Sequence, residues 1–215
     1  MHECFGIQQT LRPLKKILIL FAHPRFEESR INHALIETAS QIDGVTIRDL
    51  YERYPDFNVD IQLEQIELLQ HDVVIFHHPF YWYSCPPLLK QWIDVVLEYN
   101  WAYGPHGGFL AGKKAITALT AGGPRKVYCE SGQNNYTISQ FLRPFEQTAK
   151  LCKMDYLPPF AVLGVNKLDN DLLKDYQNQY KKLIELLKSG EIDHELRDDC
   201  QFINDLDIIN KVTFQ

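Results

Sequence analysis

The chain has 215 residues, of which 45% are hydrophobic and 23% are charged, and this length and composition suit one globular domain with a sizeable core. Its net charge of −6, without any basic patch interleaved with aromatic residues, argues against nucleic acid as the main partner, because phosphate backbones are bound by clustered Lys and Arg. The longest apolar runs have the length of a strand, far below the roughly 20 residues that span a bilayer.

Apolar runs of strand length alternate along the chain with segments of helical periodicity. Strands are predicted at 16–22, 45–50, 72–78, 113–120 and 156–163, and helices at 29–42, 61–70, 86–98, 139–153 and 171–188. Three of the strands are nearly all apolar, as a sheet covered on both faces requires. Five β/α units therefore predict an α/β fold with a flavodoxin-like, doubly wound, five-stranded parallel sheet and helices on both faces.

Two segments flank this predicted domain of residues 15–189. The N-terminal extension, 1–14, lacks the long apolar centre of a signal peptide. The C-terminal tail, 190–215, begins after Gly190, which is expected to end the last helix. An edge strand, a dimer arm and disorder are alternatives for this tail, and a surface appendage is the expectation for both ends. Five scattered cysteines without a C-x-x-C pair favour reduced thiols in a cytoplasmic protein.

The first predicted strand is followed by a polar loop that opens a helix at Ser29. Such a turn directs backbone N–H groups and the positive end of a helix dipole at one spot, which favours an anion. Ser29 can cap the helix or hydrogen-bond a phosphate, while His23, Arg25 and Arg30 add donors or positive charge. Because the first strand–helix turn of an α/β chain usually holds a phosphorylated cofactor, we predict a phosphate site here.

Two further segments follow the carboxyl ends of the third and fourth predicted strands. The first, 77–87, contains four successive aromatic residues at 80–83, which cannot all face the core because neighbouring side chains point different ways. The second contains Gly122 and Gly123, which let the backbone approach a flat ligand closely. A phosphate site, a run of aromatic side chains and two glycines that allow close approach together predict a flavin, which has a phosphate and a planar ring.

An ordered set of motifs over about residues 15 to 188 resembles the flavodoxin-like NAD(P)H:quinone oxidoreductase family. The motifs are FAHP at 21–24, SRIN at 29–32, YPDFNVD at 54–60, HPFYWYS at 78–84, PPLLK at 86–90, WID at 92–94, WAYG at 101–104, AGG at 121–123 and LPPF at 157–160. The chain is most similar to the short bacterial branch that includes the ancillary flavoproteins of glutathione-regulated potassium efflux systems.

The resemblance implies two-electron, ping-pong hydride transfer from NADH or NADPH through FMN to a quinone, with FAD as an alternative cofactor. It also implies a homodimer. An alternative role is a regulatory ancillary subunit that binds a potassium–proton antiporter on the cytoplasmic face of the inner membrane, with reductase activity secondary. A one-electron carrier like flavodoxin is a further alternative.

The resemblance also assigns roles to individual residues. The cofactor-binding residues are His23, Ser29, Arg30, Ile31, Asn32, Pro79, Phe80, Tyr81, Trp82, Tyr83, Ala121, Gly122, Gly123 and Pro124. Those at 23–32 would hold the phosphate, those at 80–83 would flank the ring and donate backbone N–H groups, and those at 121–124 would approach the rest of the ring. Tyr128 and Tyr103 are the candidate catalytic residues: Tyr128 is the candidate acid, and Tyr103 with Trp101 would shape the substrate pocket across a dimer interface.

Two departures from the family pattern bear on this site. Larger relatives carry a His six residues after the Tyr that Tyr128 matches, whereas this chain has Asn134, which cannot titrate and could only hydrogen-bond. Glu27 and Glu28 would be unfavourable near a phosphate unless they point to solvent. No metal is expected, because the histidines lack the spacing of metal ligands.

Overall fold

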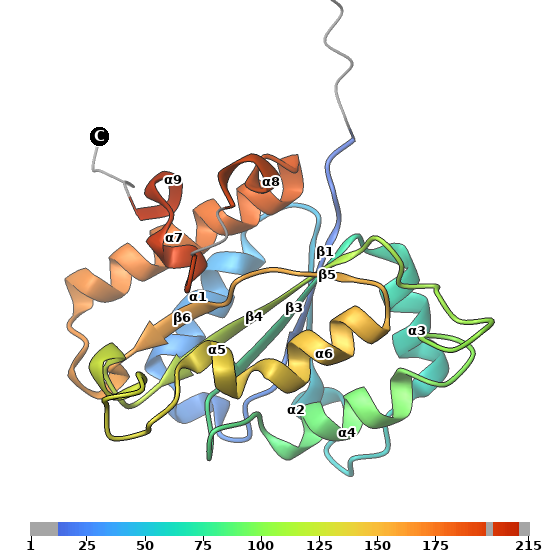
Figure 1. Ribbon diagram of the computed structural model, residues 1–215, viewed down its shortest axis with the longest axis horizontal. Helices are drawn as coiled ribbons and strands as arrows, with labels where there is room; N and C mark the ends of the chain where they lie inside the picture. The colour runs from blue at the N-terminus through green and yellow to red at the C-terminus, as the bar shows by residue number, and fades with distance from the viewer. Residues whose placement is uncertain (1–12, 197–199, 211–215) are drawn as a thin grey trace, which may run out of the picture.

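Six strands form one parallel sheet within residues 13–196 and 200–210, the ranges that the computed structural model describes (Figure 1). They are β1 (Ile17–Phe21), β2 (Val45–Asp49), β3 (Val73–Pro79), β4 (Lys114–Ala121), β5 (Asp155–Tyr156) and β6 (Phe160–Leu163). Their order is β2-β1-β3-β4-β5, with β6 also paired to β4. Every pairing is parallel, which confirms the predicted flavodoxin-like sheet of five strand positions.

The fifth strand position differs from the prediction of one continuous strand over 156–163. β5 pairs with the start of β4, and β6 pairs with its end. Pro158 and Pro159 lie between them, and proline interrupts a ladder because it has no N–H to donate. The edge of the sheet is therefore built from two short segments.

Helices cover both faces of the sheet (Figure 1). They are α1 (Arg30–Ser40), α2 (Leu50–Arg53), α3 (Ile61–Gln70), α4 (Pro87–Val96), α5 (Ile138–Phe141), α6 (Arg143–Leu151), α7 (Asn170–Ser189), α8 (Ile192–Glu195) and α9 (Asp207–Asn210). α1 and α7 pack on one face with a core that includes Leu35 and Leu183, whereas α3, α4 and α6 pack on the other around Trp92. No helix in the described ranges is both long and apolar enough to cross a membrane.

Most predicted helices are present with ends shifted by a few residues, but the one predicted at 139–153 is wrong as a single helix. It divides into α5 and α6 at Leu142, because Pro144 has no N–H and is accepted only in the first turn of a helix. α7 ends as predicted at Gly190, whose φ of +78° is the left-handed conformation that glycine adopts most easily.

The C-terminal segment 200–210 packs against the sheet edge rather than standing off the surface as expected. Phe202, Ile203, Leu206 and Ile209 are all buried. The Ile203 N–H donates to the carbonyl of Pro159 (3.0 Å), and the Ala161 N–H donates to Oδ1 of Asn204 (2.8 Å). Residues 1–12, 197–199 and 211–215 lie outside the described ranges, and the domain boundaries at 14 and 189 stay predictions.

A buried ion pair lies under the face that α3 and α4 cover. Arg48 of β2 donates through Nε to both carboxylate oxygens of Glu64 in α3, at 2.9 and 3.1 Å. The hydroxyl of Tyr54 and the indole N–H of Trp92 also donate to this carboxylate, at 2.6 and 2.9 Å. Glu64 is fully buried, so these three groups replace the water that its charge would otherwise hold.

Candidate functional site

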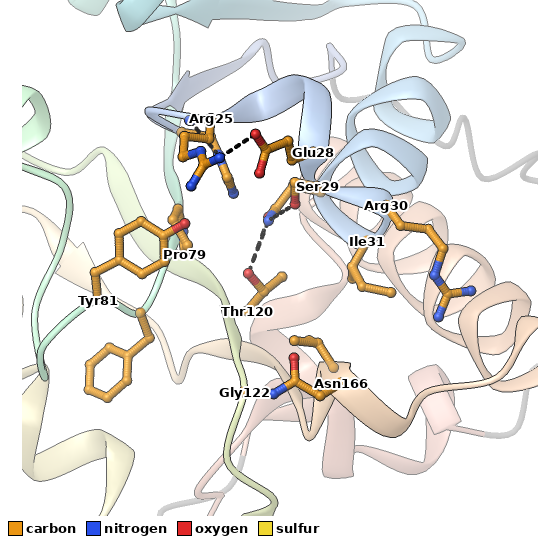
Figure 2. Close-up of a pocket in the computed structure, with 14 residues that line it drawn as sticks. Arg25, Glu28, Ser29, Arg30, Ile31, Pro79, Tyr81, Thr120, Gly122 and Asn166 are labelled. Atoms are coloured by element: carbon orange, nitrogen blue, oxygen red, sulfur yellow. Dashed lines mark hydrogen bonds and ion pairs between the residues drawn. The ribbon is translucent and has the colours of Figure 1, made fainter.

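Two cavities adjoin at the carboxyl ends of the strands and share Phe80. The first, here called the loop pocket, has a volume of about 440 Å³ and lies between the loop after β1 and the ends of β3 and β4 (Figure 2). Its lining residues are His23, Arg25, Glu28, Ser29, Arg30, Ile31, Asn32, Pro79, Phe80, Tyr81, Thr120, Gly122, Val165 and Asn166. The second, the aromatic pocket, measures about 340 Å³ and is lined by Phe80, Trp82, Tyr83, Gly123, Pro124, Val127, Tyr128, Gln133 and Asn134.

Asn32 organises the donors of the loop pocket. The residue is 2% exposed, and its side chain donates both amide hydrogens within the protein, to Oγ of Ser29 (2.8 Å) and to Oγ1 of Thr120 (3.0 Å). Ser29 is the N-cap of α1, but its side chain makes no capping hydrogen bond. Because its oxygen accepts from Asn32, its own hydroxyl hydrogen is left for another acceptor. Ser29 therefore offers a hydroxyl donor and a helix N-terminus at the same place.

A buried histidine is hydrogen-bonded to Asn32. Nε2 of His77 lies 3.1 Å from Oδ1 of Asn32, and Nδ1 lies 3.0 Å from the hydroxyl of Tyr180. Burial lowers the pKa of His77 to about 3, so its ring is neutral at physiological pH. Because Oδ1 of Asn32 can only accept, the neutral ring donates to it through Nε2 and accepts at Nδ1 from the hydroxyl of Tyr180.

The charged side chains of the loop pocket are partly committed to each other. Arg25 forms an ion pair with Glu28, and the side chains of both residues are largely exposed. Arg30 donates to the carbonyl of Leu168 and to Oδ1 of Asn170 (2.8 Å). Figure 2 shows Arg30 extended away from Ser29, whereas Arg25 lies above the cavity. Arg25 is thus better placed than Arg30 to meet an anion, which the sequence analysis did not distinguish.

His23 at the pocket wall is neutral. Burial lowers its pKa, against the opposing charge of Glu27. Its Nδ1 accepts from the N–H of Arg25 (3.2 Å), so the remaining hydrogen is on Nε2. His23 therefore acts as a hydrogen-bond donor here and not as a positive charge.

The aromatic run after β3 forms a strained tight turn. Trp82 and Tyr83 have φ of +47° and +64°, and the N–H of Ser84 donates to the carbonyl of Tyr81 (3.0 Å). Positive φ at both central residues is usually the place of Asn-Gly, and each large residue there costs on the order of 1–3 kcal/mol. The indole of Trp82 is 93% exposed, so packing of that ring does not compensate.

This turn also leaves donors unused. Within residues 13–196 and 200–210, the N–H groups of Trp82 and Tyr83 donate no hydrogen bond, whereas the Phe80 N–H is bonded to the carbonyl of Thr120 (2.7 Å). Strained backbone with unused donors at a strand end is typical of a binding site. Of the predicted ring-edge donors at 80–83, these two are available.

The floor of the aromatic pocket depends on Gly123. A Cβ at this position would stand 3.0 Å from Val127 Cγ2 and 3.1 Å from the hydroxyl of Tyr128, so glycine allows both to pack against the backbone. The ring of Tyr128 meets Phe80 edge-on at 5.9 Å, and Tyr83 stacks on Phe141 at 5.0 Å. The result is a continuous aromatic wall.

The two predicted catalytic tyrosines have different positions. Tyr128 lines the aromatic pocket, and burial together with the nearby Tyr83 raises its pKa, so it stays protonated at neutral pH. Tyr103 lies in the loop after α4, with its ring 5.7 Å from Tyr99, and lines neither pocket. Its predicted role therefore needs a partner subunit and stays a prediction.

All the predicted cofactor-binding residues except Ala121 line one of the two pockets. Ala121 is buried at the end of β4, where its carbonyl accepts from the Gly164 N–H (2.9 Å). Val165 and Asn166 also line the loop pocket but were not among the predicted residues. They lie in the loop after β6, to which the rule that ligands bind at strand ends applies equally. No group of three or more His, Cys, Asp or Glu that could hold a metal occurs in the described parts of the chain.

Comparisons with known proteins match this chain over the whole sheet. A family described by its flavodoxin-like fold matches residues 15–184. An NAD(P)H oxidoreductase of Bacillus subtilis, YdeQ, is 43% identical over 169 residues, which cover 79% of this chain and 86% of the relative. The ancillary protein KefG of a glutathione-regulated potassium-efflux system in Pectobacterium carotovorum is 44% identical over 165 residues, covering 77% and 90% of the two chains.

Two solved structures are similar over nearly their whole length. General stress protein 14 of Treponema denticola, in complex with FMN, has a TM-score of 0.77 and 36% identity, covering 80% of this chain and 99% of that one. An NADPH-quinone reductase of P. pentosaceus has a TM-score of 0.73 and 32% identity, covering 79% and 97%.

Proposed function

This chain belongs to the family with a flavodoxin-like fold, and from that premise we propose that it is an FMN-dependent NAD(P)H:quinone oxidoreductase. The observation that carries the proposal is the strained turn at Trp82 and Tyr83, whose two unused N–H groups adjoin a donor-rich pocket at a helix N-terminus. Relatives named as an NAD(P)H oxidoreductase and an NADPH-quinone reductase, and a neighbour that binds FMN, support it.

The donors of the two pockets fit the polar groups of FMN. The hydroxyl of Ser29, the N-terminus of α1 and the guanidinium of Arg25 would hold the phosphate. The N–H groups of Trp82 and Tyr83 would bond the polar edge of the ring, and Gly123 would give its plane room. When bound, FMN supplies the hydride chemistry between NAD(P)H and the quinone.

The protein's own contribution is positioning and hydrogen bonding. Phe80 and Tyr83 would contact the apolar part of the ligand in the aromatic pocket, and the protonated hydroxyl of Tyr128 is a donor for an oxygen of the acceptor. Donor and acceptor would use this one pocket in turn, which gives ping-pong kinetics.

The test is the absorbance spectrum of the purified protein, identification of the flavin released on denaturation, and initial rates with NADPH and a benzoquinone. Flavin bands, released FMN and parallel double-reciprocal lines support the proposal. Intersecting lines contradict the ping-pong mechanism, and released FAD contradicts the choice of FMN. A protein that takes up neither flavin when incubated with it contradicts the proposal as a whole.

A second role is favoured by the KefG relatives, which match this chain at 43–44% identity. In this role the protein is an ancillary subunit of a potassium–proton antiporter at the cytoplasmic face of the membrane. Deletion of the gene should then reduce potassium efflux triggered by an electrophile, and a transporter should co-purify. Unchanged efflux after deletion contradicts this role and leaves the reductase untouched.

The proposal also includes a homodimer, in which Tyr103 of one subunit reaches the aromatic pocket of the other. Light scattering on the purified protein measures the molar mass directly. A mass of one chain, 25.1 kDa, would contradict the dimer and with it the role of Tyr103.

A further inference from the structure

The C-terminal segment 200–210 lies beyond the stretch that the family match covers, which ends at residue 184, yet it holds the loop that carries Tyr128. The contact is made by Arg125 in the short helix Arg125–Val127. Its guanidinium donates to both carboxylate oxygens of Asp205, at 2.7 and 2.8 Å, and also to Oε1 of Gln201 at 3.3 Å. The same guanidinium lies 4.7 Å from the ring centroid of Phe202.

This arrangement fixes the guanidinium in two ways. A bidentate Arg–carboxylate pair restricts both distance and orientation, unlike a single-point ion pair. Contact with the face of an aromatic ring adds a second constraint from another direction. Arg125 is thus held by three residues of one segment.

The holding segment is itself anchored to the sheet. Phe202, Ile203 and Leu206 are buried, and the Ile203 N–H is bonded to the carbonyl of Pro159 between β5 and β6. Asn204 accepts from Ala161 of β6 and donates to Gln179 of α7 (3.3 Å). The position of Asp205 therefore follows from the position of the sheet edge.

The turn that follows Arg125 transmits this position to the aromatic pocket. The N–H of Val127 donates to the carbonyl of Pro124 (3.1 Å), and the N–H of Tyr128 donates to the carbonyl of Arg125 (3.0 Å). Tyr128 then packs against Gly123 and Phe80 in the aromatic pocket. Moving Arg125 would move the acceptor of the Tyr128 N–H.

We propose that the segment 200–210 positions Tyr128 at the aromatic pocket through Arg125, which acts as a positioning residue. The effect on turnover rests on the proposed function, because it requires the quinone to bind beside Tyr128. The structural part does not depend on any cofactor. Loosening this contact should weaken quinone binding while leaving the donors of the loop pocket in place.

The test compares Asp205→Asn, which removes the charge, with Asp205→Glu, which keeps a carboxylate. We expect Asp205→Asn to speed amide hydrogen exchange at Val127 and Tyr128 by about fivefold, the range of a surface ion pair. In the FMN-loaded enzyme it should raise KM for a soluble benzoquinone by a similar factor, with kcat and the FMN dissociation constant changed less than about twofold. Asp205→Glu should stay within about twofold of the parent in each measurement.

The control is Asp94→Asn, which removes a comparable exposed ion pair to Lys90 in α4. It should leave exchange at Tyr128 unchanged. Unchanged exchange in Asp205→Asn, or an equal rise in the control, would overturn the inference. If Asp205→Asn does not fold, Arg125→Lys, which cannot form the bidentate pair, takes its place with the same criteria. Exchange is measured without flavin, so a chain that binds no FMN would overturn the proposed function while this inference is still decided.

Discussion

Replacing Asn32 by Asp should weaken FMN binding much more than riboflavin binding. The amide of Asn32 gives one hydrogen to Ser29 and one to Thr120, and the hydroxyl of Thr120 donates back to Oδ1 of Asn32 (3.5 Å), so the hydroxyl hydrogen of Ser29 is the one left for a ligand. A carboxyl group carries at most one hydrogen where the amide carries two. In Asn32→Asp the ionised carboxylate has no hydrogen to donate to Ser29, so the hydroxyl of Ser29 must turn inward to donate to the new side chain, with almost no change in volume.

The magnitude follows from the bond that is lost. A hydrogen bond from a hydroxyl to a charged phosphate contributes about 1.5–3 kcal/mol. At about 1.4 kcal/mol for each factor of ten, the FMN dissociation constant should rise roughly 10- to 150-fold. The charge of the new carboxylate adds to this loss. Riboflavin has the same ring but no phosphate, so its dissociation constant should change much less.

The assay is a fluorescence titration of the flavin-free protein with FMN and with riboflavin. The ratio of the two dissociation constants isolates the phosphate contribution from any general loosening. In a Ser29→Ala background the same substitution should cost less, because the hydroxyl is already gone. Equal losses of FMN and riboflavin affinity, or an undiminished effect with Ser29→Ala, would refute the role given to this hydrogen-bond network.

Three other predictions concern charge and burial. Glu28→Gln should tighten FMN binding about two- to fivefold, because it frees Arg25 and removes a like charge, and a titration that shows weaker binding would contradict this. Glu64→Gln should lower the free energy of unfolding in urea by about 3 kcal/mol, because the buried Arg48 then keeps only its ion pair with Glu67 (3.2 Å). The pKa of His77 is about 3 in the folded protein and near 6.5 in the unfolded chain. The contribution of His77 to the free energy of unfolding is therefore complete above pH 6.5, and it falls by about 1.4 kcal/mol per pH unit as the pH is lowered toward 3. Urea unfolding of His77→Gln at pH 7 and pH 5 should show a pH dependence that is smaller by about 2 kcal/mol.

The sheet was predictable from sequence because its strands are continuous apolar runs, and β1 and β3 are buried along their whole length. The interruptions were harder to predict, since Pro158 and Pro144 stand inside apolar or periodic segments whose pattern continues on both sides. The packing of segment 200–210 was not predicted because its two helical turns, Ile203–Asp205 and Asp207–Asn210, are short and its apolar residues depend on the sheet edge for a partner.

The candidate site was predictable where the strand-end rule applies, as at His23, Ser29 and Phe80. The direction in which the long side chains of the site point was not predictable from the sequence. Arg30 reaches the carbonyl of Leu168, 138 positions away in the chain, and nothing local to the loop indicates that contact. Tertiary neighbours decide where a long side chain donates, whereas sequence decides only that it can.

The contacts of Asn204 and Ile203 with the sheet edge have a consequence for solubility. A free edge strand presents a row of N–H and C=O groups that can template pairing with another chain. Here the amide oxygen of Asn204 and the N–H of Ile203 occupy such groups beside β6, at the place where two prolines already break the strand. Strand-to-strand growth of aggregates is thereby hindered at this border, which leaves β2, at the opposite end of the sheet, as the edge strand that could pair with another chain.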